Sequence, residues 1–301
     1  MKVFMTGGTG FVGTYLSREL ASAGHTITIL TRRERPPSPV PQINFLVGNP
    51  TQEGPWMAAV PEHDWIINLA GASIFSRWTE ALKKEIMESR VKTTRNLVTA
   101  LAEGDLHQLF CSTSAVGAYG PRGEEELTED SPPDAGFLGE VARNWEAEAL
   151  QAQGLGIRVV ITRFGIVLGK GGGALGQMVP MFRKFLGGPI GSGLQWFSWM
   201  HQQDQARAYL FVQEHPEITG AVNFTAPHPV RNRDLTKALG RVLHRPTFMT
   251  APEFMLRLVL GEFADTLLTG QKVFPQRLLD AGFKFNFPAI ETALADLLGV
   301  G

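Results

Sequence analysis

The stretch Thr6 to Gly13, which reads TGGTGFVG, constrains the fold more strongly than any other part of this sequence. The run KVFM before it is typical of a buried β-strand, and FVGTYLSRELASAG after it has apolar residues at helical spacing. Glycine recurs as G-x-x-G-x-x-G, a spacing that permits a tight strand-to-helix turn and lets the backbone approach a pyrophosphate. The stretch therefore predicts a dinucleotide-binding turn, against the alternative of a tight turn without a ligand. The residues that we expect at the cofactor here are Gly7, Thr9, Gly10, Phe11, Val12 and Gly13.

The segment TITILTRRER, residues 26–35, indicates which cofactor the turn binds. In this kind of fold an acid usually lies about 20 residues after the glycine turn and holds the ribose 2′-hydroxyl of NAD. At that distance this chain carries Thr31 and Arg32. The planar fork of an arginine matches phosphate oxygens, whereas a carboxylate would repel a 2′-phosphate. We therefore predict NADP(H) as the cofactor, with Arg32 on the 2′-phosphate, Thr31 beside it and Arg33 as a solvated charge.

Alternating strand and helix patterns predict an α/β fold. Strand-like runs such as NFLVG, DWIINLAG, QLFCSTSA and IRVVITRFGIVLG alternate with helical stretches, as in a Rossmann-like doubly wound parallel sheet with helices on both faces. After residue 170 the chain becomes glycine-rich and irregular. We therefore expect an NADP-binding Rossmann domain at 1–170 and a smaller C-terminal α/β lobe at 171–301, with later segments returning to the first domain. The end of the chain, GFKFNFPAIETALADLLG, reads as a short strand and a last helix.

Charge and composition exclude several classes of partner. Net charge is -1 over 301 residues, which favours neither nucleic acid nor an anionic membrane surface as a partner. No apolar run reaches the roughly 18 residues of a membrane helix. Cys111 is the only cysteine, and the start MKVFMTGG has no signal-peptide pattern, so we expect a reducing, cytoplasmic location. The seven histidines are scattered, and no metal site is expected.

Several stretches together resemble an atypical extended short-chain dehydrogenase/reductase, of the subgroup named epimerase family protein. The glycine turn belongs to the whole superfamily, whereas GGPIGSG-x-Q and GF-x-F-x-FP-x-IE-x-AL resemble this subgroup specifically. The resemblance covers nearly the full length and includes a characteristic C-terminal segment at 245–301. The stretches that carry it are TGGTGFVG, NLAGASI, ESRVKTTRNLV, STSAVGAYG, RFGIVLGKGGGAL, GGPIGSGLQWFSWMHQQD and GFKFNFPAIETALADLL.

The resemblance implies further cofactor contacts. Leu69 and Ala70 would line the adenosine and pyrophosphate side, Arg90 would reach cofactor oxygens, and Val167 would meet the nicotinamide end through its backbone. Glu85 would hold a ribose hydroxyl or Arg90 itself. For Leu69, Ala70 and Val167, ordinary sheet packing is the alternative.

In this superfamily a serine or threonine, a tyrosine and a lysine four residues later transfer the proton. STSAVGAYG supplies the serine, with Ser114 as the catalytic match and Ser112 close by at the cofactor. No Y-x-x-x-K occurs in the chain, and GFLGEVARNWEAEAL stands where the pair would lie. Tyr119 is a substitute that could face the nicotinamide. The usual mechanism therefore cannot be transferred.

Other polar residues near these motifs have structural explanations. Arg143 and Glu146 are spaced as a local helical ion pair. Asp204 is expected to cap a helix rather than to catalyse, and His201 to be a satisfied structural histidine.

The sequence thus predicts an NADP(H)-binding oxidoreductase or epimerase-like protein that acts by hydride transfer on a small carbonyl or hydroxyl substrate. Its retained serine and glycine-rich lid favour an enzyme. The missing tyrosine–lysine pair favours the alternative, a non-catalytic NADPH-binding sensor or regulatory module. The family resemblance also implies a possible homodimer through helices around residues 80–103 and 137–152.

Overall fold

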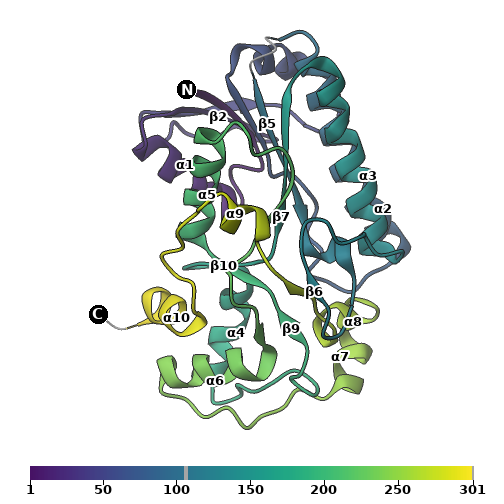
Figure 1. Ribbon diagram of the computed structural model, residues 1–301, viewed down its shortest axis with the longest axis vertical. Helices are drawn as coiled ribbons and strands as arrows, with labels where there is room; N and C mark the ends of the chain where they lie inside the picture. Colours follow the sequence, from purple (N-terminus) through teal and green to yellow (C-terminus); the bar gives the residue numbers. More distant parts are fainter. Residues whose placement is uncertain (105–107, 300–301) are drawn as a thin grey trace.

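The computed structural model describes residues 1–104 and 108–299, and its central feature is a seven-stranded parallel sheet (Figure 1). Chain order reverses between β1 and β4, which lie side by side, so the crevice at this switch point is where such sheets bind ligands. The predicted Rossmann-like doubly wound sheet is confirmed. Its strands, in spatial order, are β11 (Gly220–Phe224), β7 (Arg158–Phe164), β5 (Leu109–Ala115), β4 (Trp65–Asn68), β1 (Lys2–Thr6), β2 (Thr26–Thr31) and β3 (Ile43–Val47).

Helices cover both faces of the sheet (Figure 1). One face carries α1 (Phe11–Ser22) and α5 (Gln202–Glu214), and the other carries α2 (Glu80–Leu101) and α3 (Phe137–Leu150). Side chains alternate along a strand, so Val3 and Met5 enter the core under α1 and α5, whereas Phe4 enters the core under α2 and α3. Each central strand is therefore apolar on both sides, as a doubly covered parallel strand requires.

A smaller lobe lies below the carboxyl edge of the sheet in Figure 1. Its core joins β8 (Ile166–Leu168), β10 (Trp199–His201), α4 (Gly173–Arg183), α6 (Asn232–Leu243) and α10 (Ile290–Leu298). β11 returns to the main sheet after α4 and α5. The remaining elements are short: β6 (Glu126–Leu127), β9 (Trp196–Phe197), β12 (Val230–Arg231), β13 (Lys272–Val273), α7 (Glu253–Leu260), α8 (Phe263–Leu268), α9 (Gln276–Asp280), and the 3₁₀ turns η1 (Pro55–Glu62), η2 (Val116–Tyr119) and η3 (Gln151–Leu155). Across the described residues, no helix combines the length and the apolarity that crossing a membrane would take.

The C-terminal stretch corrects two expectations. Residues 282–289 form no strand, and the backbone N–H groups of Asn286 and Phe287 donate instead to the carboxylate of Asp204, each at 2.8 Å. Asp204 is 1% exposed and lies in the first turn of α5, whose N-cap is His201. The prediction that Asp204 caps this helix is therefore wrong, because its carboxylate satisfies a distant chain segment that lacks a strand partner.

Candidate functional site

A cleft of about 930 Å³ opens at the carboxyl edge of the sheet, between the ends of β1, β2 and β4 and one face of α2. It brings together eight of the residues assigned to the cofactor from the sequence. They are Gly7, Thr9, Gly10, Thr31, Arg32, Leu69, Ala70 and Glu85.

The glycine turn forms the floor of this cleft. Gly7 has a left-handed backbone with φ of 67°, and a Cβ atom there would lie 2.6 Å from the carbonyl carbon of Leu69. A Cβ atom at Gly13 would lie 2.4 Å from the carbonyl oxygen of Gly7, so α1 can begin this close to β1 only with glycine. The turn thus leaves the N-terminus of α1 bare toward the cleft, where its free N–H groups suit a pyrophosphate.

The other residues of the turn extend the site toward the lobe. The ring of Phe11 lies against Gly169, Gly172 and Gly173, so the glycine-rich segment packs on this side chain in the first turn of α1. Val12 lies in the first turn of α1 and is partly exposed. The absence of side chains in the glycine-rich segment is what allows this close contact.

The tip of β2 carries Arg32 where an acid would bind a ribose. Arg32 is exposed and lines the cleft, and the hydroxyl of Thr31 donates to the carbonyl of Arg33 at 3.2 Å. Arg33 itself is exposed, in line with a solvated charge. Beside this tip the chain after β3 contributes Asn49 and Thr51, which sequence reasoning missed. The sequence could have indicated them, because neighbouring parallel strands end at the same edge of a sheet and the residues after β3 therefore lie near the tip of β2.

Arg90 is a largely buried arginine behind the cleft. Its Nη1 donates to the carbonyls of Ala72 (3.1 Å) and Ile86 (3.0 Å), and its guanidinium lies 5.2 Å from the ring centre of Trp145. Burial lowers the pKa of Arg90 to about 10, which leaves it charged at neutral pH. Because these carbonyls hold the guanidinium, a role for Glu85 as the partner of Arg90 is not supported, and the ribose contact of Glu85 stays a prediction.

Two further predicted cofactor residues lie outside the cleft lining. Ser112 is buried and accepts a hydrogen bond from Asn68 Nδ2 at 3.4 Å, and Asn68 Oδ1 in turn accepts one from the hydroxyl of Thr6. Val167 lies in β8, where it pairs with Met200 of β10. Their contacts with a cofactor stay predictions. The remaining residues of the cleft lining are Leu30, Pro50, Gln52, Gly71, Ala72, Ser73, Ser76, Ala81, Leu82, Lys84, Glu88, Ser89, Lys92 and Thr93.

Ser114 belongs to a buried polar network at the ends of β5 and β7. Its hydroxyl donates to Glu146 Oε1 at 2.6 Å, and the same carboxylate accepts from Nε (2.9 Å) and Nη2 (2.8 Å) of Arg163. Burial alone would lower the pKa of Arg163, but hydrogen bonds and charge from Glu146 outweigh it and raise the pKa above its ordinary value. The predicted local pair of Arg143 with Glu146 is wrong, because Arg143 points to the carbonyl of Asp134.

Tyr119 is also part of this network and not of the cleft. Its hydroxyl donates to Asn223 Oδ1 at 2.7 Å and accepts from Arg163 Nη1 at 2.8 Å, and the side chain is fully buried. Burial raises the pKa of Tyr119. This placement corrects the expectation that Tyr119 could face the nicotinamide, since its hydroxyl is committed to core partners.

His201 has the structural role expected of it. Its Nδ1 accepts from the backbone N–H of Gln203 at 3.1 Å, and its Nε2 lies 3.2 Å from Asp296 Oδ2. Burial lowers the pKa of His201, which favours the neutral ring. No cluster of three or more histidine, cysteine or acidic residues suited to a metal occurs within residues 1–104 and 108–299.

Comparison with known families identifies two matching regions. Residues 3–223 match the NAD dependent epimerase/dehydratase family, and residues 251–297 match a domain of unknown function, DUF1731. The second region contains α7 to α10, with the last helix seated on α6.

Named relatives match over nearly the whole chain. The chain is 38% identical over 302 residues to a chloroplastic epimerase family protein, the SDR39U1 homolog of Arabidopsis thaliana, covering 99% of this chain and 87% of that one. It is 38% identical over 304 residues to the epimerase family protein YfhF of Bacillus subtilis, covering 99% and 98%.

Solved structures agree with the fold. The human epimerase family protein SDR39U1, crystallised with NADPH, is 35% identical, with a TM-score of 0.89 and coverage of 99% of both chains. A nucleoside-diphosphate sugar epimerase from Corynebacterium glutamicum is 32% identical, with a TM-score of 0.79, covering 99% of this chain and 58% of that one. The resemblance inferred from the sequence motifs is confirmed.

Proposed function

The chain belongs to the NAD dependent epimerase/dehydratase family, and from this premise we propose that it binds NADPH in preference to NADH. The observation that carries the proposal is Arg32, exposed at the tip of β2 and lining the cleft where an acid would select NAD. The human relative crystallised with NADPH supports it. The glycine turn would hold the pyrophosphate, and Arg32 the 2′-phosphate.

The first experiment is isothermal titration of NADPH and NADH into the wild type and two variants. A hydrogen bond to a charged group contributes about 1.5–3 kcal/mol. Because Arg32 is exposed, we expect the lower end, which is a preference for NADPH of roughly tenfold. Arg32→Asp should remove this preference, with NADH affinity unchanged or higher. Arg33→Ala is the matched control, because neighbouring residues leaving a strand point to opposite sides.

Two outcomes would contradict this assignment. Equal affinity of the wild type for the two cofactors would remove Arg32 as a selective contact. Loss of both cofactors in Arg32→Asp would indicate a damaged fold, which thermal denaturation of the same variant would reveal.

For the reaction we propose hydride transfer on a small carbonyl or hydroxyl substrate. The cofactor, when bound, would supply a hydride to a carbonyl as NADPH or accept one from a hydroxyl-bearing carbon as NADP+. Ser114, at the carboxyl end of β5, is the proposed hydroxyl of the site, oriented by Glu146 at 2.6 Å. Ser114→Ala should lower turnover by roughly ten- to ten-thousand-fold, the span seen for acid–base groups. Brisk turnover by that variant would exclude the serine.

The second candidate function is a non-catalytic NADPH-binding sensor. One observation favours it: Ser114 is almost fully buried and its hydroxyl already donates to Glu146, in a chain without Y-x-x-x-K. A broad panel of aldehydes, ketones and alcohols separates the two, because the sensor should bind NADPH and leave every substrate unchanged. A homodimer and a cytoplasmic location stay predictions.

A further inference from the structure

The segment 73–78, between β4 and α2, borders the cofactor cleft on one side and the C-terminal region on the other. It forms no helix or strand, and Ser73 and Ser76 line the cleft. Other residues of the segment contact α7 and α8, which lie below the lower ends of α2 and α3 in Figure 1. Two parts of the chain that are far apart in the sequence therefore meet at one short irregular segment.

Phe263 of α8 provides the apolar part of this contact. Its ring centre lies 5.9 Å from that of Phe75 and 5.8 Å from that of Trp78. The ring of Trp78 also lies 5.2 Å from that of Phe137 on α3. Phe263 is 4% exposed, so the segment packs on a ring that is fixed in the interior. Aromatic pairs of this kind stabilise a contact beyond the area that they bury.

Two polar contacts join the same surfaces. Arg77 Nη1 donates to the carbonyl of Leu258 at 3.3 Å, and Lys83 Nζ, near the start of α2, lies 2.5 Å from Glu262 Oε2. Among the described residues, the Arg77 bond is the only hydrogen bond that joins 73–78 to a distant part of the chain, since the others lie within the segment. The segment therefore takes its long-range polar support from the C-terminal region.

The opposite end of α8 is fixed to the lobe by the glutamine of the GGPIGSG-x-Q stretch. Gln195 Nε2 donates to the carbonyls of Leu267 (2.9 Å) and Ile190 (3.1 Å). Gly261 turns the chain between α7 and α8 with a left-handed backbone, at φ of 58°. α8 therefore bridges the lobe and the segment that lines the cofactor cleft.

We propose that Glu262 and Phe263 are positioning residues for the dinucleotide, because they hold the segment 73–78 at the wall of the cleft. The inference rests on the proposed function only in that the cleft binds a dinucleotide. A wall that is already in place loses less conformational freedom when the cofactor binds, and affinity rises. By linkage, the bound cofactor stabilises the bridge by the same factor. Selectivity between cofactors is separate, since Arg32 lies on another element, the tip of β2.

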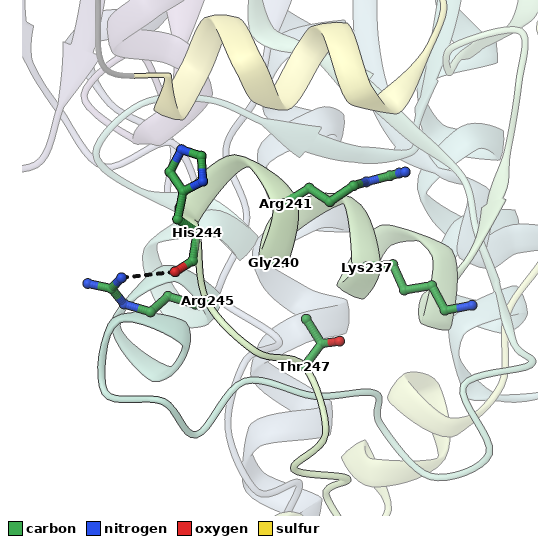
Figure 2. Close-up of a pocket in the computed structure, with 6 residues that line it drawn as sticks. All are labelled: Lys237, Gly240, Arg241, His244, Arg245 and Thr247. Carbon is green, nitrogen blue, oxygen red and sulfur yellow. Dashed lines mark hydrogen bonds between the residues drawn. The ribbon is translucent and has the colours of Figure 1, made fainter.

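A second exposed ion pair of the C-terminal region lies outside this bridge. Arg241 of α6 pairs with Glu291 of α10 at 3.1 Å, beside a concavity of about 630 Å³ that shares no lining residue with the cofactor cleft. The cations of that concavity do not converge, because the guanidinium of Arg245 points away from Lys237 and Arg241 (Figure 2). The side chains of Glu291 and Glu262 are 58% and 62% exposed, so Glu291→Gln is the matched control for Glu262→Gln.

The experiment titrates NADPH and NADH calorimetrically into the full-length wild type, Glu262→Gln, Phe263→Leu and Glu291→Gln. An exposed ion pair contributes little, so Glu262→Gln should raise the Kd of both cofactors about threefold. Phe263→Leu loses two aromatic contacts and should raise both Kd values about tenfold. The ratio of the two Kd values should stay that of the wild type, and Glu291→Gln should bind both cofactors like the wild type. Glu262→Gln keeps the test valid if Phe263→Leu fails to fold, because Glu262 is exposed.

Hydrogen exchange gives the reciprocal readout, which a purely structural role would not change. Saturating NADPH should slow amide exchange of residues 261–268 several-fold in the wild type and slow exchange in α10 less.

Test variants that bind both cofactors like Glu291→Gln would overturn the proposal and leave the preference for NADPH standing. So would exchange at residues 261–268 that NADPH leaves unchanged. Equal affinity of the wild type for NADPH and NADH, with both weakened in Glu262→Gln, would remove the preference and support the positioning role. A wild type that binds neither dinucleotide would overturn both.

Discussion

Removing the carboxylate of Glu146 should destabilise the fold strongly, because it would leave Arg163 without its ionic partner. The side chains of Glu146 and Arg163 are 13% and 10% exposed, so water replaces little of the lost interaction. Removing one member of a buried pair costs about 3–5 kcal/mol. Arg163 keeps its hydrogen bonds to Tyr119 and to the carbonyl of Glu129, so we expect about 3 kcal/mol for Glu146→Leu.

Thermal and urea denaturation of purified variants would measure this cost. The entropy of unfolding is about 2.1 cal/mol/K per residue, or roughly 0.6 kcal/mol/K for a chain of this length, so Tm should fall by about 5 °C. Glu146→Gln is the conservative control. Its amide oxygen can still accept from Ser114 and from Arg163 Nε, so it should cost about half as much.

A double variant tests the electrostatic reasoning itself. Glu146→Leu combined with Arg163→Met removes both charges, and apolar residues of similar volume often replace a buried pair without loss. The double variant should therefore be more stable than either single variant. If Glu146→Leu cost less than about 1 kcal/mol, or if the two single effects simply added, the pair would not be the buried, coupled unit described above.

Three further changes test other parts of the structure. Burial raises the pKa of Glu129, so this side chain contributes to stability at low pH, where it is protonated, and the contribution is lost as pH rises through its pKa in the folded state. The Tm of Glu129→Gln should therefore match that of the wild type below about pH 4 and exceed it at pH 7. Gly13→Ala places a Cβ atom against the Gly7 carbonyl, and calorimetry should detect no NADPH binding, with about 2 kcal/mol or more lost in urea denaturation. Asp204→Ala should lower the free energy of unfolding by about 3 kcal/mol and expose the stretch 282–289 to limited proteolysis, because the backbone N–H groups of this stretch lose their acceptor. Unchanged resistance to proteolysis would argue against the anchoring role of Asp204.

The fold and the glycine turn at the cleft were predictable because their signals are local. A strand, a glycine turn and an amphipathic helix occupy the first 24 residues, and each is recognised from spacing alone. The position of Arg32 at the cleft was predicted in the same way, from its distance along the sequence to Gly13. The C-terminal stretch 282–289 was not, since an apolar run with alternating phenylalanines has the pattern of a strand. What keeps it irregular is Asp204, about 80 residues earlier, whose carboxylate takes the place of a neighbouring strand.

The partner of Glu146 shows which long-range contacts a sequence can still disclose. Helical spacing predicted Arg143 as the ion-pair partner of Glu146. Without the order of the strands, the sequence shows only neighbours along the same helix. The parallel register pairs Ser114 of β5 with Arg163 of β7, and both side chains reach Glu146 on α3. One residue earlier, Thr113 and Thr162 lie within 3.4 Å and 3.1 Å of the hydroxyl of Tyr209 on α5.

This alternation follows from the period of two along a strand, so equivalent residues of adjacent parallel strands face the same helix layer. The same rule locates the cleft residues that were missed. Thr31 of β2 pairs with Val47 of β3, so the chain that leaves β3 must pass beside Arg32, and Asn49 and Thr51 do line the cleft there. Once the strand order is assumed, register along the carboxyl edge predicts side-chain neighbours that spacing within a single element cannot supply.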